Sequence, residues 1–137
     1  MSNGLKIGIA GLGTVGSSLG QLLETKAHTL TKSCGKDLTV TAVCAANKDK
    51  DRGFDISKAA WFDDAVELAA NADINVLVEL IGGEDGVAYQ AVKSALSRGC
   101  HVVTANKALL AKHGMEFAKI AEEKGVILNY EAAIAAI

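Results

Sequence analysis

The residues with the clearest chemical meaning form a glycine-rich run near the start of the chain, Gly11-Leu12-Gly13-Thr14-Val15-Gly16. Glycines at this spacing permit a tight turn, let a pyrophosphate approach the backbone, and let the next helix pack closely on the preceding strand. An apolar run at 5–10 precedes the turn, and apolar residues at helical spacing follow it at 15–24. This order predicts a loop that binds a dinucleotide through helix N-terminal amides, with a purely structural turn as the alternative.

The end of the second predicted strand, at 38–45, bears on the choice of nucleotide. An NAD-specific enzyme usually has Asp or Glu here to hold the ribose hydroxyls, but this chain has two alanines and Asn47. Lys48, Lys50 and Arg52 follow, partly neutralised by two aspartates. The missing carboxylate and the nearby cations favour a 2′-phosphate, and therefore NADP over NAD, while a solvated charged loop is the alternative.

The third predicted strand, at 74–80, leads into Ile81, Gly82 and Gly83. The two glycines permit close approach of a flat group such as a nicotinamide ring or a ribose. Glu79 places a carboxylate in an otherwise apolar strand, which is costly unless the group is paired or hydrogen-bonded. For Glu79 we favour a structural acceptor of backbone amides near the glycine loop over a catalytic role.

Asn106 and Lys107 follow the fourth predicted strand, at 101–104. Asn106 can cap the next helix. Lys107 then falls in the first turn of that helix, where the dipole disfavours a cation. Because ligands bind at the carboxyl ends of parallel strands, this lysine is a candidate donor to the cofactor carboxamide or to a carbonyl oxygen that receives hydride. An ordinary surface lysine is the alternative.

Five strand-like runs alternate with helical patterns, which predicts right-handed βαβ units. The predicted strands span 5–10, 38–45, 74–80, 101–104 and 126–130, and the predicted helices span 15–24, 65–70, 87–98 and 114–124. Gly99 and Gly125 stand just past two of these helices, where left-handed caps are expected. The predicted fold class is therefore α/β, a Rossmann-type doubly wound parallel sheet in three layers, α/β/α.

The composition suits a single soluble domain over residues 1–137. Half of the residues are hydrophobic and only 4% are aromatic, so the core must be aliphatic. A net charge of -2 without a basic stripe gives no support for nucleic-acid binding. A strand that begins by Leu5 leaves no room for a signal peptide, and no apolar run approaches the ~20 residues of a membrane span. We therefore expect a cytoplasmic protein.

The cysteines and histidines predict neither a disulfide framework nor a zinc site. The three cysteines are odd in number and form no C-x-x-C pair, and the three histidines show no ligand spacing with them. Cys44 lies in an apolar run, so we expect an inert buried thiol.

Several of these segments together resemble homoserine dehydrogenase. The resemblance covers essentially the whole chain, including 7–16, 78–83, 122–126 and 131–133. Its most specific part is the run His101-Val102-Val103-Thr104-Ala105-Asn106-Lys107-Ala108-Leu109-Leu110-Ala111. The resemblance implies NAD(P)-dependent interconversion of aspartate semialdehyde and homoserine, in the biosynthesis of threonine, methionine and isoleucine.

The resemblance also implies roles for particular residues. The family's cofactor contacts map onto Gly11, Gly13, Thr14, Val15, Thr104 and Lys107, and Lys107 matches a lysine that lies near both nicotinamide and substrate. A monovalent cation site would use the Glu131 carboxylate and the main-chain carbonyls of Ile134 and Ala136. The chain departs from the family at Ala46, where an arginine is common, and at 134–137, where the family has valine and a glycine pair.

The family's substrate-binding and dimerisation domain has no counterpart in this sequence. We therefore interpret the chain as a cofactor-binding domain that binds a nicotinamide dinucleotide and turns over homoserine negligibly by itself, while the complete enzyme would be a homodimer. Two alternatives stay open. One is another oxidoreductase of the same architecture, such as a relative of aspartate dehydrogenase or a Gfo/Idh-type enzyme. The other is a non-catalytic module that senses dinucleotides.

Overall fold

The computed structural model of the chain describes residues 5–11, 38–44, 60–81 and 85–130. Within them lies a six-stranded parallel sheet in the order β3-β2-β1-β4-β5-β6. The strands are β1 (Leu5–Ala10), β2 (Leu38–Cys44), β3 (Ala60–Phe62), β4 (Val76–Glu79), β5 (His101–Thr104) and β6 (Leu128–Tyr130). The described helices are α2 (Ala65–Asn71), α3 (Val87–Ser97) and α4 (Lys107–Lys124).

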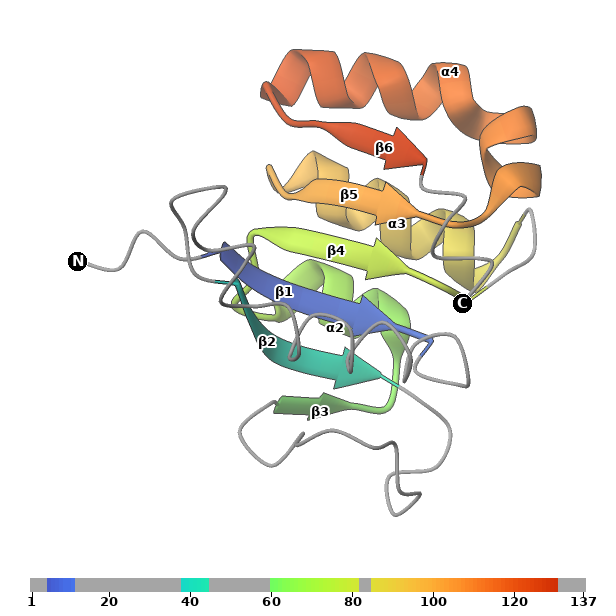
Figure 1. Cartoon of the computed structure of the whole chain (residues 1–137). Helices are drawn as coiled ribbons and strands as arrows, with labels where there is room; N and C mark the ends of the chain where they lie inside the picture. Colours follow the sequence, from blue (N-terminus) through green and yellow to red (C-terminus); the bar gives the residue numbers. More distant parts are fainter. Residues whose placement is uncertain (1–4, 12–37, 45–59, 82–84, 131–137) are drawn as a thin grey trace.

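The strand order reverses between β1 and β4, the two central strands (Figure 1). From β1 the chain order runs outward through β2 to β3, and from β4 it runs outward the other way through β5 to β6. All the arrows in Figure 1 point toward one edge, so the carboxyl ends of the strands share one side of the molecule. The predicted Rossmann-type doubly wound sheet is confirmed, and its switch point lies at β1 and β4, where ligands bind in such folds.

The described helices form one layer against this sheet. Helix α3 packs between α2 and α4, and in Figure 1 both α2 and α3 lie behind the strands. Helix α2 contacts β1 and β2, α3 contacts β4 and β5, and α4 contacts β6. The predicted helix at 15–24, and with it the third layer of the predicted sandwich, falls outside the described residues.

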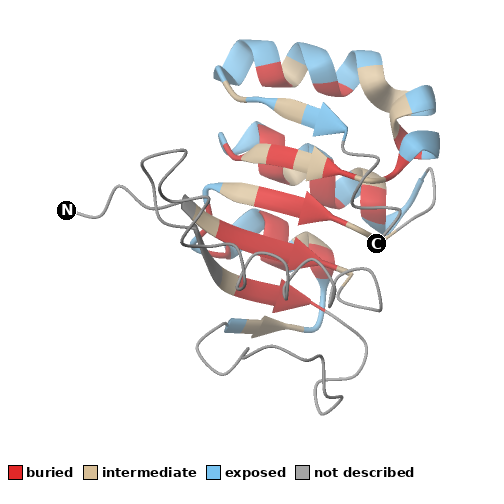
Figure 2. Ribbon diagram, viewed as in Figure 1, coloured by how far each residue is buried: buried red, intermediate tan, exposed pale blue. Residues whose placement is uncertain are grey.

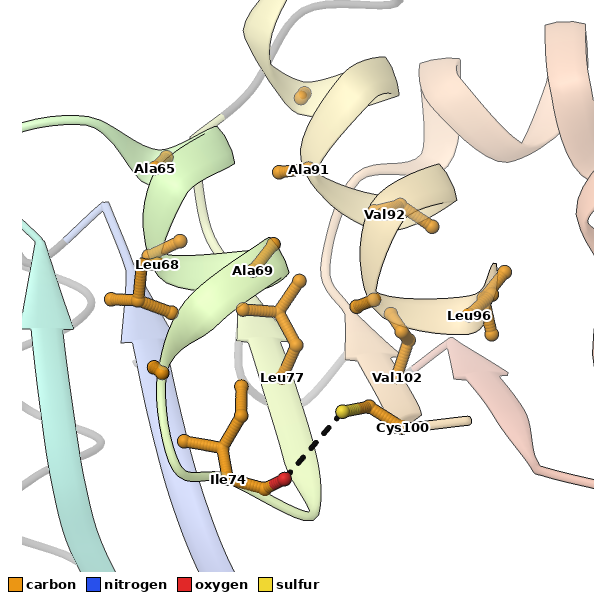
Figure 3. Packing of buried hydrophobic residues seen from close by; sticks show 14 of the residues in the cluster. Ala65, Leu68, Ala69, Ile74, Leu77, Ala91, Val92, Leu96, Cys100 and Val102 are labelled. Atoms are coloured by element: carbon orange, nitrogen blue, oxygen red, sulfur yellow. Dashed lines mark hydrogen bonds between the residues drawn. The ribbon is translucent and has the colours of Figure 1, made fainter. Parts of the chain in front are cut away.

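Small aliphatic residues set the packing of α2 on α3. The predicted apolar stripe of α3 is buried in full; it consists of Ala88, Ala91, Val92, Ala95 and Leu96. Figure 3 shows Ala91, Val92 and Leu96 of this stripe beside Leu68 and Ala69 of α2, above Leu77 of β4. Because alanine has a short side chain, the two helices lie close together over the central strands, and Figure 2 shows those strands as the most buried part of the sheet.

The structure adds one strand to the prediction and moves several boundaries: β4 begins at Val76 instead of 74, β6 begins at Leu128 instead of 126, and the largest shift is at the start of α4. Strand β3 was not predicted, because it is only three residues long and lies at the edge of the sheet with an exposed first residue. Helix α4 begins at Lys107 instead of at 114, since only Leu109, Phe117 and Ala121 of its 18 residues are buried and the apolar period is weak. The left-handed caps are confirmed, with φ of 90° at Gly99 and 68° at Gly125. Among the described residues, no helix has both the length and the apolarity that crossing a bilayer requires.

Candidate functional site

The turn that leaves β1 is held from both sides. Gly11 has a φ of 93°, in the left-handed region that favours glycine. Its N–H donates to the carbonyl oxygen of Cys44 at 2.9 Å, which ties the turn to the end of β2. A Cβ here would lie 2.8 Å from the carbonyl carbon of Leu80 and 2.9 Å from the nitrogen of Ile81. Glycine is therefore required where β1 enters the predicted phosphate loop.

A buried carboxylate joins the ends of β4 and β5. The Glu79 side chain is fully buried, and its Oε2 accepts a hydrogen bond from the Ile81 N–H at 2.7 Å. Its Oε1 accepts a hydrogen bond from the Thr104 hydroxyl at 2.6 Å. Charge-assisted hydrogen bonds of this kind offset the cost of burying the carboxylate. Glu79 thus accepts a backbone amide, as expected from the sequence, and its carboxylate links the ends of β4 and β5.

The same network continues into α4. The Thr104 hydroxyl accepts a hydrogen bond from the Asn106 N–H at 2.9 Å, so one buried oxygen serves both neighbours. The Asn106 side chain is buried and its Oδ1 accepts from the Leu109 N–H at 3.0 Å, which confirms the predicted helix cap. The start of α4 is therefore fixed relative to the ends of β4 and β5.

Lys107 is the first residue of α4, as the cap at Asn106 requires. Its side chain is exposed, and it forms no ion pair with any described residue. The helix dipole disfavours a cation in the first turn, and an exposed side chain gains little from packing. Neither local electrostatics nor burial therefore accounts for a lysine at this position. Lys107 directly follows Asn106, the last residue of the Glu79–Thr104–Asn106 network, at the carboxyl edge of the sheet.

A cavity of about 350 Å³ lies at the same edge. It is lined by residues that end β1, β2, β3 and β4 or begin α2 and α3, namely Gly11, Cys44, Asp63, Asp64, Ala65, Ile81 and Val87. Burial, followed by the charges of Asp64 and Asp63, raises the pKa of the Cys44 thiol above its ordinary value. This agrees with the expectation of an inert, buried thiol.

The sequence prediction did not single out Asp63. The sequence does carry a signal there: Asp63 and Asp64 stand just before an apolar helical pattern, where one aspartate is expected to cap the helix and the other is not needed for that role. Asp64 does so, since its Oδ1 accepts from the Val66 N–H at 2.9 Å. Asp63 becomes a candidate ligand-binding residue only in the folded structure, because β3 pairs with β2 and so brings Asp63 into the lining of the cavity.

The structure brings five predicted site residues to this one edge: Gly11, Ile81, Thr104, Asn106 and Lys107. Seven other predicted cofactor contacts lie outside the described residues, namely Gly13, Thr14, Val15, Gly16, Asn47, Gly82 and Gly83. The same is true of the predicted cation ligands Glu131, Ile134 and Ala136. Over the part of the chain that the structure describes, no group of three or more His, Cys, Asp or Glu side chains is arranged to hold a metal ion.

A comparison with known families decides what kind of domain this is. Residues 11–131 match the sequence pattern of the family described as "Homoserine dehydrogenase, NAD binding domain". The chain belongs to this family. Its homoserine dehydrogenase relatives include one from Pseudomonas aeruginosa, 44% identical over 133 residues, which cover 96% of this chain and 30% of the relative. Another, from Neisseria gonorrhoeae, is 41% identical over 96% of this chain and 30% of the relative.

Solved structures of homoserine dehydrogenases have the same fold. The enzyme from Thiobacillus denitrificans aligns with a TM-score of 0.84 and 34% identity, over 96% of this chain and 30% of that one. The enzyme from S. aureus aligns with a TM-score of 0.82 and 32% identity, over 96% of this chain and 33% of that one. This chain thus spans about a third of the length of these homoserine dehydrogenases and corresponds to their NAD-binding domain.

Proposed function

We propose that this chain is the cofactor-binding part of a homoserine dehydrogenase, which reduces L-aspartate 4-semialdehyde to L-homoserine with NADPH or NADH. The observation that carries the proposal is the hydrogen-bonded network Ile81–Glu79–Thr104–Asn106, which holds the switch-point edge beside Lys107. The family match assigns the domain to a nicotinamide dinucleotide, and this network provides a rigid edge on which such a ligand can be oriented.

Each part of the edge has a proposed role. A bound nicotinamide dinucleotide supplies the hydride, and the chain supplies orientation and charge. The loop that begins at Gly11 holds the pyrophosphate with backbone amides, while Ile81 and the glycines after it accommodate the nicotinamide ring. Lys107 donates a hydrogen bond to the carboxamide or to the substrate carbonyl oxygen, where it stabilises developing negative charge.

We propose further that the complete enzyme is a homodimer, with a monovalent cation site and with substrate-binding residues that this chain does not supply. The curated relatives are more than three times as long as the stretch they share with this chain, which covers 30% of each. We expect the 137-residue chain to bind the dinucleotide and to turn over homoserine negligibly without the remaining part of the enzyme. Glu131 and the carbonyls of Ile134 and Ala136 are the proposed cation ligands.

NADP is the proposed preference over NAD, because Lys48, Lys50 and Arg52 follow β2 and no carboxylate occupies 45–47. Asp63 and Asp64 act against this preference, since they place negative charge at the end of the neighbouring strand. Calorimetric titration of the chain with NAD and with NADP measures the balance directly. Equal affinities would contradict the argument from the three cations.

Activity is tested in a chimera that joins residues 1–130 of this chain to the rest of the Pseudomonas aeruginosa relative. We expect NADP-dependent oxidation of homoserine, and a loss of about 100-fold or more in kcat for Lys107→Met. The matched control is Lys119→Met, which removes an exposed cation from the same helix, away from its N-terminus. A folded chimera that binds cofactor but leaves homoserine unchanged would contradict the proposed reaction, and equal rates for the two variants would contradict the role of Lys107.

A further inference from the structure

The start of α3 lacks the side-chain cap that holds the other two described helices. Asp64 caps α2 and Asn106 caps α4, but the N-cap of α3 is Gly86, which has no side chain to accept a hydrogen bond from the first turn. Gly86 has a φ of 73°, and no atom of a described residue lies within 4 Å of the position that a Cβ would take. Neither a capping side chain nor packing at this residue therefore fixes where α3 begins.

A contact with α4 takes the place of the missing cap. Asp85, the residue before Gly86, accepts a hydrogen bond from the Lys112 ammonium at Oδ2, at 2.6 Å, and one from Nε2 of His113 at Oδ1, at 2.9 Å. We call Asp85, Lys112 and His113 the Asp85 clamp. Because the hydrogen bonds around Asn106 fix the start of α4, the clamp ties the backbone just before α3 to a rigid support.

The clamp acts on the segment that borders the cavity at the carboxyl edge of the sheet. Ile81 and Val87 both line that cavity, and Asp85 lies between them in the chain, two residues before Val87. The Val87 side chain is about half exposed, so little packing holds it in place. Ile81 is held independently, because its N–H donates to the buried carboxylate of Glu79. Release of Asp85 would therefore free the cavity wall at Val87 and leave the wall at Ile81 unchanged.

His113 is the member of the clamp that can respond to pH, since histidine ordinarily titrates between about pH 5 and pH 8. Its side chain is mostly buried, with 18% exposed, and its ring centroid lies 4.4 Å from that of Tyr89. A carboxylate only accepts hydrogen bonds, so Nε2 carries a hydrogen in the neutral ring as well as in the protonated ring. Protonation of His113 therefore keeps the hydrogen bond to Asp85, turns it into an ion pair, and places a cation beside an aromatic ring.

The other groups around His113 decide the sign of the effect. The charged and titratable side chains of the described residues that face the clamp are Asp85 before α3, Tyr89 and Lys93 on α3, and Lys112 and Glu116 on α4. The two lysines oppose a further cation and the two carboxylates favour it, and of these groups Asp85 is hydrogen-bonded to the ring. Hydrogen bonds from Lys112 and His113 lower the pKa of Asp85, so this carboxylate stays charged while a histidine titrates. The clamp is therefore stronger when His113 is protonated.

We propose that the Asp85 clamp positions the start of α3 against the dinucleotide site, and that protonation of His113 tightens the clamp and so strengthens binding of the ligand. The inference rests on the proposed function, because the ligand is the same dinucleotide. Asp85 and His113 are positioning residues, since they act through the backbone at Val87 and are not required to touch the ligand. Lys112 holds Asp85 at every pH in this range, which limits the size of the effect.

The clamp itself is tested without ligand, by NMR titration of the isotope-labelled chain. In the wild-type chain, the Val87 amide signal should shift with pH along the same curve as the His113 ring signals, because one proton controls both. In Asp85→Asn the charge that attracts both partners is lost, and in His113→Gln a donor remains that cannot be protonated. The Val87 signal should shift with neither curve in these two variants. A wild-type Val87 signal that does not follow His113 would overturn the inference.

A binding experiment connects the clamp to the ligand. The probe is NAD, because NADP carries a 2′-phosphate that itself titrates at about pH 6. In calorimetry, we expect the dissociation constant of the wild-type chain to rise about twofold to fivefold from about pH 5 to about pH 8, as the modest strength of an exposed ion pair predicts. Asp85→Asn and His113→Gln should lack this rise and should bind NAD at least as weakly as the wild-type chain does at about pH 8.

Asp73→Asn is the matched control, because it breaks another exposed ion pair, with Lys6, and lies before β4 at the opposite edge of the sheet. This control should keep the wild-type pH dependence. Circular dichroism of each variant establishes that the fold is retained.

The outcomes separate the inference from the proposed function. A wild-type dissociation constant that is the same at both pH values would overturn the inference and leave the proposed function intact. A pH dependence that survives in both Asp85→Asn and His113→Gln would also overturn it, because another group would then be responsible. A wild-type chain that binds no dinucleotide would contradict the proposed function and the link to the ligand, and the NMR titration would still decide whether the clamp positions Val87.

Discussion

The Thr104 hydroxyl is the most informative single group to remove, because it both donates to Glu79 and accepts from the Asn106 N–H. Thr104→Val keeps the shape of the side chain and deletes this one oxygen. Loss of a hydrogen bond to a buried charge costs about 1.5–3 kcal/mol, and a buried amide left without an acceptor costs about 1–3 kcal/mol. We therefore expect the free energy of unfolding to fall by about 3–5 kcal/mol, since Glu79 keeps its bond to Ile81.

A loss of this size is a large part of the roughly 5–15 kcal/mol that stabilises a typical domain. It should lower Tm by about 10–20 °C, and urea denaturation followed by circular dichroism gives the free energy directly. Thr104→Ser is the matched control, because it keeps the hydroxyl and loses one methyl group, at about 1 kcal/mol. If the valine variant proved as stable as the serine variant, the network would not stabilise the edge in the way we describe.

Three further predictions address the turn, the cavity and the loop before α3. Gly11→Ala should lower the free energy of unfolding by about 2–4 kcal/mol and abolish dinucleotide binding, because its Cβ would meet the backbone of Leu80 and Ile81. Gly99→Ala is the control, since Gly99 has a φ of 90° but no atom within 4 Å of its Cβ, and it should lose only about 1–2 kcal/mol. Equal losses for the two variants in urea denaturation would contradict the steric argument. Cys44, whose pKa is raised above 9.0 by burial and two carboxylates, should react with iodoacetamide at neutral pH more slowly than free cysteine, and peptide mass spectrometry would reveal the opposite. Hydrogen bonds from Lys112 and His113 lower the pKa of Asp85 from its ordinary value of 3.8. The stability that these bonds contribute is therefore present above that pH and is lost as the pH falls through the lowered pKa. A plot of Tm against pH should lack this acid-dependent loss in Asp85→Asn, and the prediction is wrong if the wild-type and Asp85→Asn plots have the same shape.

Much of the fold follows from the sequence through two periodicities. Apolar runs predicted every strand except β3, and the stripe of α3 is buried as its 3.6-residue spacing predicts. The strand that was missed, β3, has three residues and an exposed start, so it carries no such signal. It forms because β2 offers it an unpaired edge, which is a tertiary condition.

The residues of the site also fall into two groups, those that neighbouring residues predict and those that depend on tertiary structure. Glycine at position 11 and the cap at Asn106 are consequences of local backbone geometry, so they could be predicted from neighbouring residues. The partners of Glu79 could not, because Thr104 lies 25 positions away and meets the carboxylate only when β4 and β5 pair in register. The sequence indicated that this buried charge needed a donor and gave no means of identifying it.

The sequence by itself determined the class of fold, the need for glycine at position 11 and the family resemblance, because each depends on residues that are close together in the chain. Only the tertiary structure decided which strand ends meet. It brings Asp63 into the lining of a cavity with Gly11, Cys44 and Ile81, although these residues come from four separate strand ends. The physical reason is that a parallel sheet brings together the carboxyl ends of strands distant in sequence, and their order in space is set by packing.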